Sequence, residues 1–155
     1  MSVKADAETF RGIPLFVECE PVHLQLLAFS AVRQTFEPGE TVLKQGFKGG
    51  AAFLILSGRV DLSADTAGKI GSAGPGAMLG EVAMIGAAAY AITARASEPL
   101  VTARIDRELF MRVAREYPDF GAAVFRALSR KLDYSMDDLG AVRQAFDQAR
   151  SFKSL

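Results

Sequence analysis

The 155-residue sequence contains one cysteine, one histidine and no tryptophan, and its 18 basic residues balance its 18 acidic residues. Because Cys19 is the single cysteine, an intramolecular disulfide is excluded. Cys19 and His23 together cannot supply the several Cys and His ligands of a zinc site within one chain. The absence of surplus positive charge argues against a general nucleic-acid coat protein, which must neutralise phosphates.

Catalytic machinery is also absent. A Ser-His-Asp triad would have to use His23, which lies in an apolar helical stretch far from any nucleophile motif. No acid–base pair and no nucleophile beside an oriented base is visible, so we do not expect an enzyme. We expect Cys19 to be a small buried or half-buried side chain and His23 to lie on the surface of a helix.

Long hydrophobic runs are missing as well. The most apolar stretch, Val82 to Ile92, is interrupted by Gly86 and falls short of the roughly 18 residues that a membrane span needs. Residues Met1 to Phe10 have no apolar signal-peptide core. The hydrophobic share of 50% predicts a packed globular domain. We therefore expect a soluble cytoplasmic protein without a membrane partner.

Short apolar runs cut by glycine and proline dominate residues 32–106. A helix is predicted before them over 21–29, with Pro21 at its start and Val22, Leu26 and Phe29 on one face. The expected strands are 32–36, 41–44, 52–56, 59–64, 69–72, 78–79, 93–96 and 101–105. Turn signals at such short spacing indicate an antiparallel barrel or sandwich.

The pattern becomes helical after Asp106. This residue is a plausible N-cap for a helix over 107–116, Tyr117-Pro118 breaks that helix, and another begins near Pro118. From Leu128 the spacing of a coiled-coil seam continues through Leu132, Ser135, Leu139, Val142, Phe146 and Ala149. Two alternatives remain open for this seam: packing on the barrel of its own chain, or pairing with a second subunit.

The segment around Gly80 contains the residues that indicate a ligand-binding site. Gly74-Pro75-Gly76 predicts a turn, Met78-Leu79 a short strand, and Gly80 the start of a short helix. A glycine before a helix lets a ligand approach bare backbone amides, which favour an anion such as a phosphate. Glu81 then lies in the first turn, where its carboxylate can accept a hydrogen bond from a hydroxyl.

Three glycine-punctuated blocks follow one another in order, at residues 39–46, 52–60 and 74–83. Together they resemble the cyclic nucleotide-binding domain of catabolite-activator-type regulators, kinase regulatory subunits and nucleotide-gated channels. The resemblance covers roughly 16–139. It implies an α+β domain over 1–139: an eight-stranded antiparallel jelly roll over 32–106, with helices over 21–29 and 107–139. Residues 140–155 would be a helical extension or tail.

The resemblance also implies a ligand, cyclic AMP or cyclic GMP, and no cofactor or metal. Glu81 would accept from the ribose 2′-hydroxyl, and the amides of Val82 and Ala83 would face the cyclic phosphate. The positions of the family's phosphate-binding arginine and serine or threonine fall on Tyr90 and Ala91. The full set of implied site residues is Met78, Leu79, Gly80, Glu81, Val82, Ala83, Tyr90 and Ala91, with Leu128 and Leu132 as guesses for the lid.

Tyr90 and Ala91 depart from the family pattern and remove a charge-assisted phosphate contact. Such a bond contributes roughly 1.5–3 kcal/mol, so its loss weakens binding about ten- to a hundredfold. Three alternatives remain open for Tyr90: it donates its hydroxyl to a phosphate, it fills the phosphate end of the pocket, or it adapts the pocket to a less charged molecule. Arg95 is too far along the strand to replace the arginine and is expected in solvent.

The leading hypothesis is a regulatory ligand-binding module that signals to an unknown effector by movement of its C-terminal helices. The alternative is a degenerate module that binds no nucleotide and serves as a homodimeric scaffold or partner-interaction protein. Too few residues follow Leu139 for a helix-turn-helix domain, so direct DNA binding is not expected.

Overall fold

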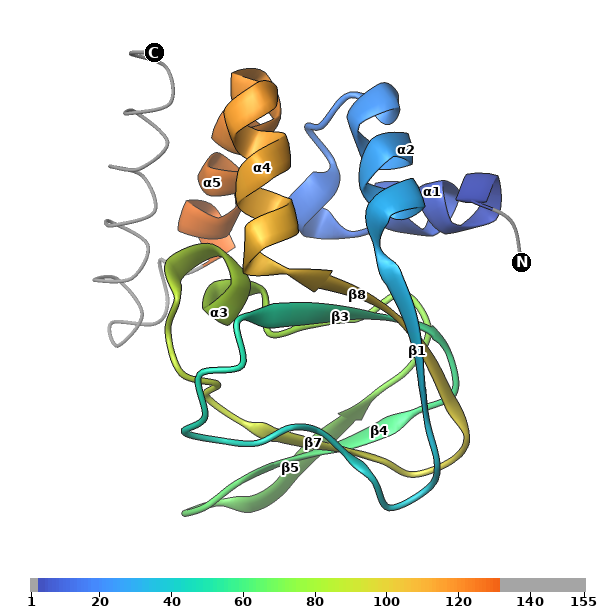
Figure 1. The fold of residues 1–155 in the computed structure, drawn as a ribbon. Coiled ribbons are helices and arrows are strands. Elements are labelled where there is room, and N and C mark those ends of the chain that lie inside the picture. Colours follow the sequence, from blue (N-terminus) through green and yellow to red (C-terminus); the bar gives the residue numbers. More distant parts are fainter. Residues whose placement is uncertain (1–2, 132–155) are drawn as a thin grey trace.

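The computed structural model describes residues 3–131 (Figure 1). Within this range the strands are β1 (Val32–Phe36), β2 (Thr41–Leu43), β3 (Ala51–Ser57), β4 (Val60–Ala64), β5 (Gly68–Ala73), β6 (Met78–Leu79), β7 (Thr93–Ala96) and β8 (Leu100–Asp106). The helices are α1 (Val3–Arg11), the 3₁₀ turn η1 (Pro14–Phe16), α2 (Pro21–Ser30), α3 (Glu81–Gly86), α4 (Arg107–Glu116) and α5 (Pro118–Lys131). The predicted mainly antiparallel fold with flanking helices is confirmed. The predicted seam beyond Leu128 and the extension over 140–155 lie outside the described residues.

The strands form two four-stranded sheets, in the orders β1-β8-β3-β6 and β2-β7-β4-β5. Every pairing between neighbouring strands is antiparallel. The sheets enclose a core that includes Phe36, Phe53, Val60 and Leu100. In Figure 1 helices α1, α2, α4 and α5 lie above the first sheet, α3 lies beside the end of β3, and the second sheet lies below.

Strand β3 is buried on both faces, which explains its continuous apolar run. Side chains alternate along a strand, so Phe53 and Ile55 belong to the core of the barrel, whereas Ala52 and Leu54 belong to the core under the helices. The first sheet therefore separates a barrel core from a helical core.

The helical core is built largely from phenylalanine rings. Phe10 and Phe16 have ring centroids 5.8 Å apart, Phe16 and Phe120 are 6.4 Å apart, and Phe110 and Phe120 are 5.8 Å apart. Helix α1, which brings Phe10 to this cluster, was not predicted. Its sequence is mostly polar, but Val3, Ala7 and Phe10 have the i, i+4, i+7 spacing of one helix face, a signal that was missed.

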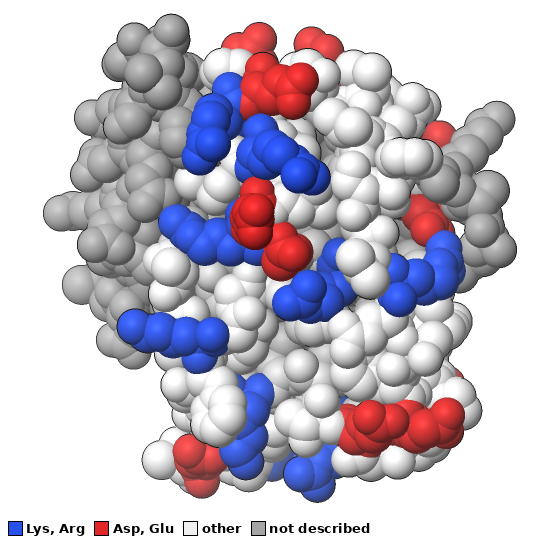
Figure 2. Space-filling view, in the orientation of Figure 1, with Lys and Arg blue, Asp and Glu red and all other residues white. Residues whose placement is uncertain are grey.

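Helix α2 buries a different side from the one that its apolar spacing suggested. Val22 is 59% exposed and Phe29 is 74% exposed, whereas Leu24 and Leu27 are buried. The helix is apolar nearly all round, so periodicity could not select the buried side. Figure 2 shows the surface over α2 as white, because this helix carries no charged residue.

The expectation that His23 lies on the surface is wrong. Its side chain is 9% exposed, and its ring lies 4.7 Å from that of Tyr117, centroid to centroid. Cys19, in contrast, is half-buried as expected.

The predicted N-cap at Asp106 is confirmed. The Asp106 carboxylate accepts a hydrogen bond from the Leu109 amide at 2.7 Å, which caps α4. Helix α4 ends at Glu116, immediately before the predicted break at Tyr117-Pro118.

Replacement of this cap gives a test of the boundary. Asp106→Ala leaves the amide of Leu109 without its acceptor, and we expect the free energy of unfolding to fall by about 1 kcal/mol. Asp106→Asn keeps a capping oxygen, so its free energy of unfolding should fall much less. Urea denaturation of both variants measures the difference, and equal losses would show that the cap is not the cause.

Candidate ligand-binding site

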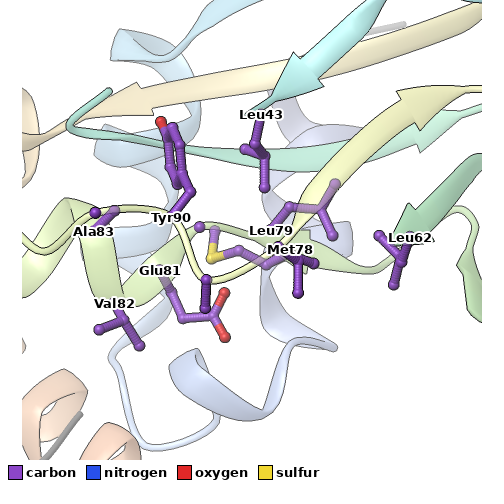
Figure 3. Close-up of a pocket in the computed structure, with 12 residues that line it drawn as sticks. Leu43, Leu62, Met78, Leu79, Glu81, Val82, Ala83 and Tyr90 are labelled. Atoms are coloured by element: carbon purple, nitrogen blue, oxygen red, sulfur yellow. The ribbon is translucent and has the colours of Figure 1, made fainter. Parts of the chain in front are cut away.

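A cavity of about 310 Å³ opens between α3, β6 and the inward side chains of the second sheet (Figure 3). The structure brings together at its wall all eight residues implied by the sequence. Four lining residues were missed. Leu43 and Leu62 project inward from β2 and β4, and strand alternation could have indicated them; Ala89 and Ile92 flank Tyr90-Ala91. The complete lining is Leu43, Leu62, Met78, Leu79, Gly80, Glu81, Val82, Ala83, Ala89, Tyr90, Ala91 and Ile92.

Gly80 turns the chain from β6 into α3 in a conformation that favours glycine. Its φ is +81°, and a Cβ at this position would stand 2.9 Å from the Ala51 carbonyl oxygen. The Met84 amide donates to the Gly80 carbonyl at 3.1 Å, which begins the α-helical ladder. The earlier amides of Val82 and Ala83 belong to the first turn, where a helix offers its amides no intrahelical acceptor.

Tyr90 is held by four hydrogen bonds. Its hydroxyl donates to the Ala51 carbonyl at 2.8 Å and accepts from the Ala51 amide at 3.3 Å. Its backbone amide donates to Phe47, at 3.0 Å, and its carbonyl accepts from Gly46, at 2.8 Å. The side chain is 8% exposed and belongs to the barrel core. Tyr90 therefore fastens the loop between β2 and β3 to the start of β3.

The ring of Tyr90 fits because two glycines leave room for it. A Cβ on Gly49 would overlap the Tyr90 hydroxyl, and a Cβ on Gly80 would stand 3.0 Å from the edge of the ring. In Figure 3 the hydroxyl of Tyr90 and the carboxylate of Glu81 point in opposite directions. The hydroxyl is thus directed to the backbone of β3 and the carboxylate is at another part of the wall.

Negative charge is the only charge that the described residues bring to this cavity. Glu81, which is 9% exposed, is its one acidic residue, and no lysine, arginine or histidine among residues 3–131 lines it. Arg95, as expected from the sequence, is an exposed residue of β7. A phosphate in this cavity would lie near apolar side chains and a carboxylate.

A second cavity, also of about 310 Å³, adjoins the first. Met78 and Glu81 line both cavities, and the remaining wall of the second comes from Ile13 and η1, the β5–β6 turn and Ala127 of α5. Leu128, a guess for the lid, is 1% exposed in the helical core and lines neither cavity. Leu132, the other guess, lies outside the described residues.

Arg107 connects the far end of α3 to α4. Its guanidinium donates to the carbonyl of Met84 at 3.0 Å and to the carbonyl of Ile85. Its backbone amide donates to the Gly50 carbonyl at 2.7 Å, next to the residue that holds the Tyr90 hydroxyl. Partial burial lowers the pKa of Arg107 from its usual value. One residue at the start of α4 therefore contacts both the end of α3 and the residue before β3.

Other reactive groups lie elsewhere. Burial raises the pKa of the Cys19 thiol to about 12, so this thiol stays protonated at neutral pH. Across residues 3–131 no group of three or more His, Cys, Asp and Glu side chains is placed to hold a metal ion. No helix in that range is long and apolar enough to cross a membrane.

Known proteins share this fold and sequence pattern. The cyclic nucleotide-binding domain model matches residues 33–117, more than half of the chain. A cyclic nucleotide-binding-like protein from Brucella abortus is 31% identical, with a TM-score of 0.62 over 70% of this chain and 97% of that chain. The Thermus thermophilus catabolite activator protein is 25% identical, with a TM-score of 0.68 over 84% of this chain and 63% of that chain.

A cAMP-dependent protein kinase regulatory subunit from Yarrowia lipolytica is 34% identical over 77 residues, which are 50% of this chain and 20% of the relative. The chain spans between 20% and 66% of the length of the curated relatives that it matches. With the family match over more than half of its length, and with the two sheets and the Gly80–Glu81 turn in place, the chain belongs to the cyclic nucleotide-binding domain family, a family of regulatory ligand-binding domains.

Proposed function

We propose that this chain is a regulatory ligand-binding module whose binding of a cyclic nucleotide phosphate is weak. The observation that carries this proposal is the position of the Tyr90 hydroxyl on the backbone of Ala51. A hydroxyl that already donates to one buried group and accepts from another has no free proton for a phosphate. Tyr90 fills the place that the resemblance gives to an arginine.

The energetic consequence follows from the missing cation. An anion loses its hydration when it enters an apolar cavity, and the loss must be offset by charge or hydrogen bonds. Here the amides of Val82 and Ala83 would be the donors, without a lysine or arginine among the lining residues that are described. We therefore expect cyclic AMP or cyclic GMP to bind about ten- to a hundredfold more weakly than with an arginine present.

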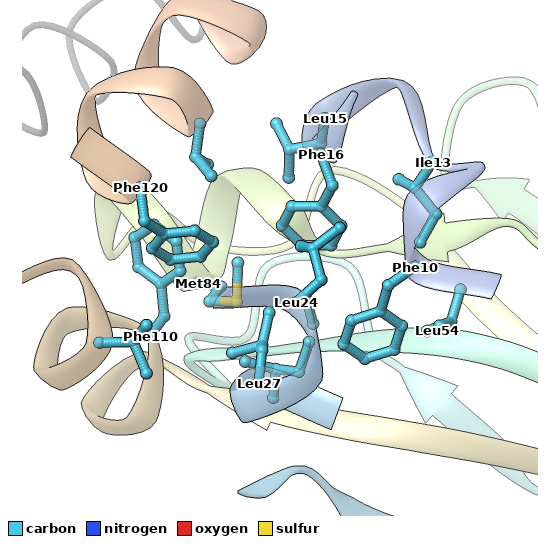
Figure 4. Packing of buried hydrophobic residues seen from close by; sticks show 14 of the residues in the cluster. Phe10, Ile13, Leu15, Phe16, Leu24, Leu27, Leu54, Met84, Phe110 and Phe120 are labelled. Atoms are coloured by element: carbon cyan, nitrogen blue, oxygen red, sulfur yellow. The ribbon is translucent and has the colours of Figure 1, made fainter. Parts of the chain in front are cut away.

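Signalling would pass from α3 to the C-terminal helices. Ala83 belongs to the barrel core, and Met84 and Ile85, both 0% exposed, belong to the helical core. Figure 4 shows Met84 in the cluster that also contains Phe110 and Phe120. A ligand that favours one position of α3 therefore also favours one arrangement of α4 and α5, which would act on an effector.

A second candidate function is a degenerate module that binds no nucleotide and serves as a scaffold, as a homodimer or with another protein. The same Tyr90 hydrogen bonds support it, because they complete the wall of the barrel without any ligand. The helical seam proposed for the homodimer lies beyond the described residues.

Titration with cyclic AMP and cyclic GMP separates the two candidates. We expect weak binding by the wild-type chain, and about ten- to a hundredfold tighter binding by a Tyr90→Arg/Ala91→Ser variant, because the new guanidinium and hydroxyl contact the phosphate. Isothermal titration calorimetry measures both affinities.

A Tyr90→Gln/Ala91→Ser variant is the matched control, since it is polar but uncharged at position 90. Thermal unfolding without ligand checks that each variant folds. If the wild-type chain binds as tightly as the arginine variant, Tyr90 does not weaken the phosphate site. If a folded arginine variant also fails to bind, the scaffold function is favoured.

The two hydrogen bonds between the Tyr90 hydroxyl and the backbone of Ala51 can be tested by measuring stability without ligand. Tyr90→Phe removes both bonds to Ala51, and we expect the free energy of unfolding to fall by about 1–3 kcal/mol. Tyr117→Phe is the control, because the hydroxyl of Tyr117 makes no hydrogen bond with another residue of the described chain. Urea denaturation measures the stability of both variants. Equal stability of the two would show that the hydrogen bonds from Tyr90 to Ala51 do not stabilise the fold.

The connection through Arg107 predicts a change in local opening. Arg107→Met leaves the carbonyls of Met84 and Ile85 without the guanidinium, and we expect the amides of α3 to exchange about threefold faster or more. Arg112, an exposed arginine on the same helix, provides the control variant Arg112→Met. NMR measures the amide hydrogen exchange rates of α3 in both variants. Unchanged rates in Arg107→Met would show that Arg107 does not couple α3 to α4.

A further inference from the structure

A third cavity, of about 300 Å³, lies between β2, the loop that follows it, the start of β3 and Arg104 of β8. Leu43 and Tyr90 line both this cavity and the first one. One edge of the Tyr90 ring lies beside Gly80, which lines the first cavity, and the other edge lies beside Gly49, which lines the third. Tyr90 therefore stands between the two cavities.

The third cavity is lined by two basic side chains. Lys44 and Arg104 are the charged residues in its described lining. Lys44 is exposed directly after β2 and forms no ion pair with any residue that the structure describes. Two cations beside one concave surface raise the local concentration of anions. The charge of this cavity therefore favours an acidic ligand.

The guanidinium of Arg104 is held in place but keeps donors for a ligand. Its Nη1 lies 3.6 Å from a carboxylate oxygen of Asp106, which is beyond hydrogen-bond distance, and Asp106 itself does not line the cavity. The side chain of Arg104 is 33% exposed, so an anion can reach it from solvent. A guanidinium has five N–H donors, and its fork matches two oxygens of a carboxylate or a phosphate. Arg104 can therefore bind an acidic group and keep its ion pair.

The remaining wall places apolar surface beside the two cations. Phe53 is 5% exposed and lies opposite Arg104 in the pairing of β3 with β8. Phe47 is 65% exposed, and its amide donates to the Lys44 carbonyl at 3.1 Å, so a turn keeps this ring near Lys44. An exposed ring releases water when an apolar group covers it. The cavity therefore suits a ligand that combines one acidic group with an apolar body.

We propose that the third cavity binds a small molecule with one acidic group, a carboxylate or a phosphate, on a compact apolar body. Arg104 and Lys44 would bind the acidic group, and Phe47 and Phe53 would contact the apolar body. This site goes beyond the proposed function, since none of these four residues lines the first cavity. A ligand in the third cavity would also contact Tyr90, which forms part of the wall of the first.

Four probes that share a phenyl ring test the head group: benzoate, phenyl phosphate, benzyl alcohol and benzylamine. Each is titrated into the full chain while NMR follows the methyl groups of Val42, which lines the third cavity, and of Leu62 and Val82, which line the first. We expect the acids to shift the Val42 methyl groups and to bind about tenfold more tightly than benzyl alcohol, with benzylamine weakest. Comparison of benzoate with phenyl phosphate identifies the preferred acidic group.

Arg104→Met removes the guanidinium and keeps a long apolar side chain. In this variant we expect benzoate to lose about tenfold in affinity, while benzyl alcohol keeps its affinity. Lys44→Met, at an exposed position, should weaken benzoate about two- to fivefold. Arg112→Met, on the exposed side of α4 and outside the lining, is the matched control and should keep the wild-type affinities. Thermal unfolding checks that each variant folds, and Lys44→Met still tests the charge if Arg104→Met does not fold.

The proposal is overturned if benzyl alcohol or benzylamine binds as tightly as the acids, if the acids shift Leu62 and Val82 but not Val42, or if no probe binds. It is also overturned if neither Arg104→Met nor Lys44→Met weakens the binding of benzoate. These results are independent of the cyclic nucleotide titration, because a cyclic nucleotide in the first cavity would shift Leu62 and Val82. Acids that bind at Val42 without any cyclic nucleotide binding would support this site and reject the cyclic nucleotide site. Cyclic nucleotide binding without acids at Val42 would do the reverse.

Discussion

Burial of strand β3 on both faces is the constraint on which the rest of the structure depends. Strand β3 supplies Phe53 to the barrel core and Leu54 to the helical core, so the two layers share one strand. Helix α3 lies where the two cores meet, with Ala83 on one side and Met84 on the other. A binding site placed against such a helix is connected to the helical layer by packing alone, before any hydrogen bond is considered.

Tyr90 lines the site and is at the same time a packing residue of the barrel. The ring occupies the inside of the barrel, and the hydroxyl satisfies two backbone groups of Ala51 that would otherwise need partners. The first cavity, which Tyr90 lines, contains a buried acidic residue, Glu81, and has no lysine or arginine in its described lining. Gly49 and Gly80 are part of the arrangement because each leaves space for the ring.

The sequence predicted the strands, the Gly80 turn and the Asp106 cap because each has a local signal: alternation, a glycine before a helix, or a carboxylate before one. It also indicated eight residues that the structure places around one cavity, through their match to a family pattern. It could not choose among three roles for Tyr90, because the partner of its hydroxyl is Ala51, 39 residues away in the chain. The buried side of α2 and the burial of His23 were missed for a similar reason, since packing against α1, α4 and the segment around Tyr117 and Phe120 decides them.

The shortness of β6 has a further consequence. This strand has two residues and lies at the edge of the first sheet, where unpaired backbone groups could recruit a strand from another molecule. Gly80 and α3 follow it at once, so the chain leaves the sheet before a longer edge is exposed. The two-residue strand therefore offers almost no edge to a foreign strand.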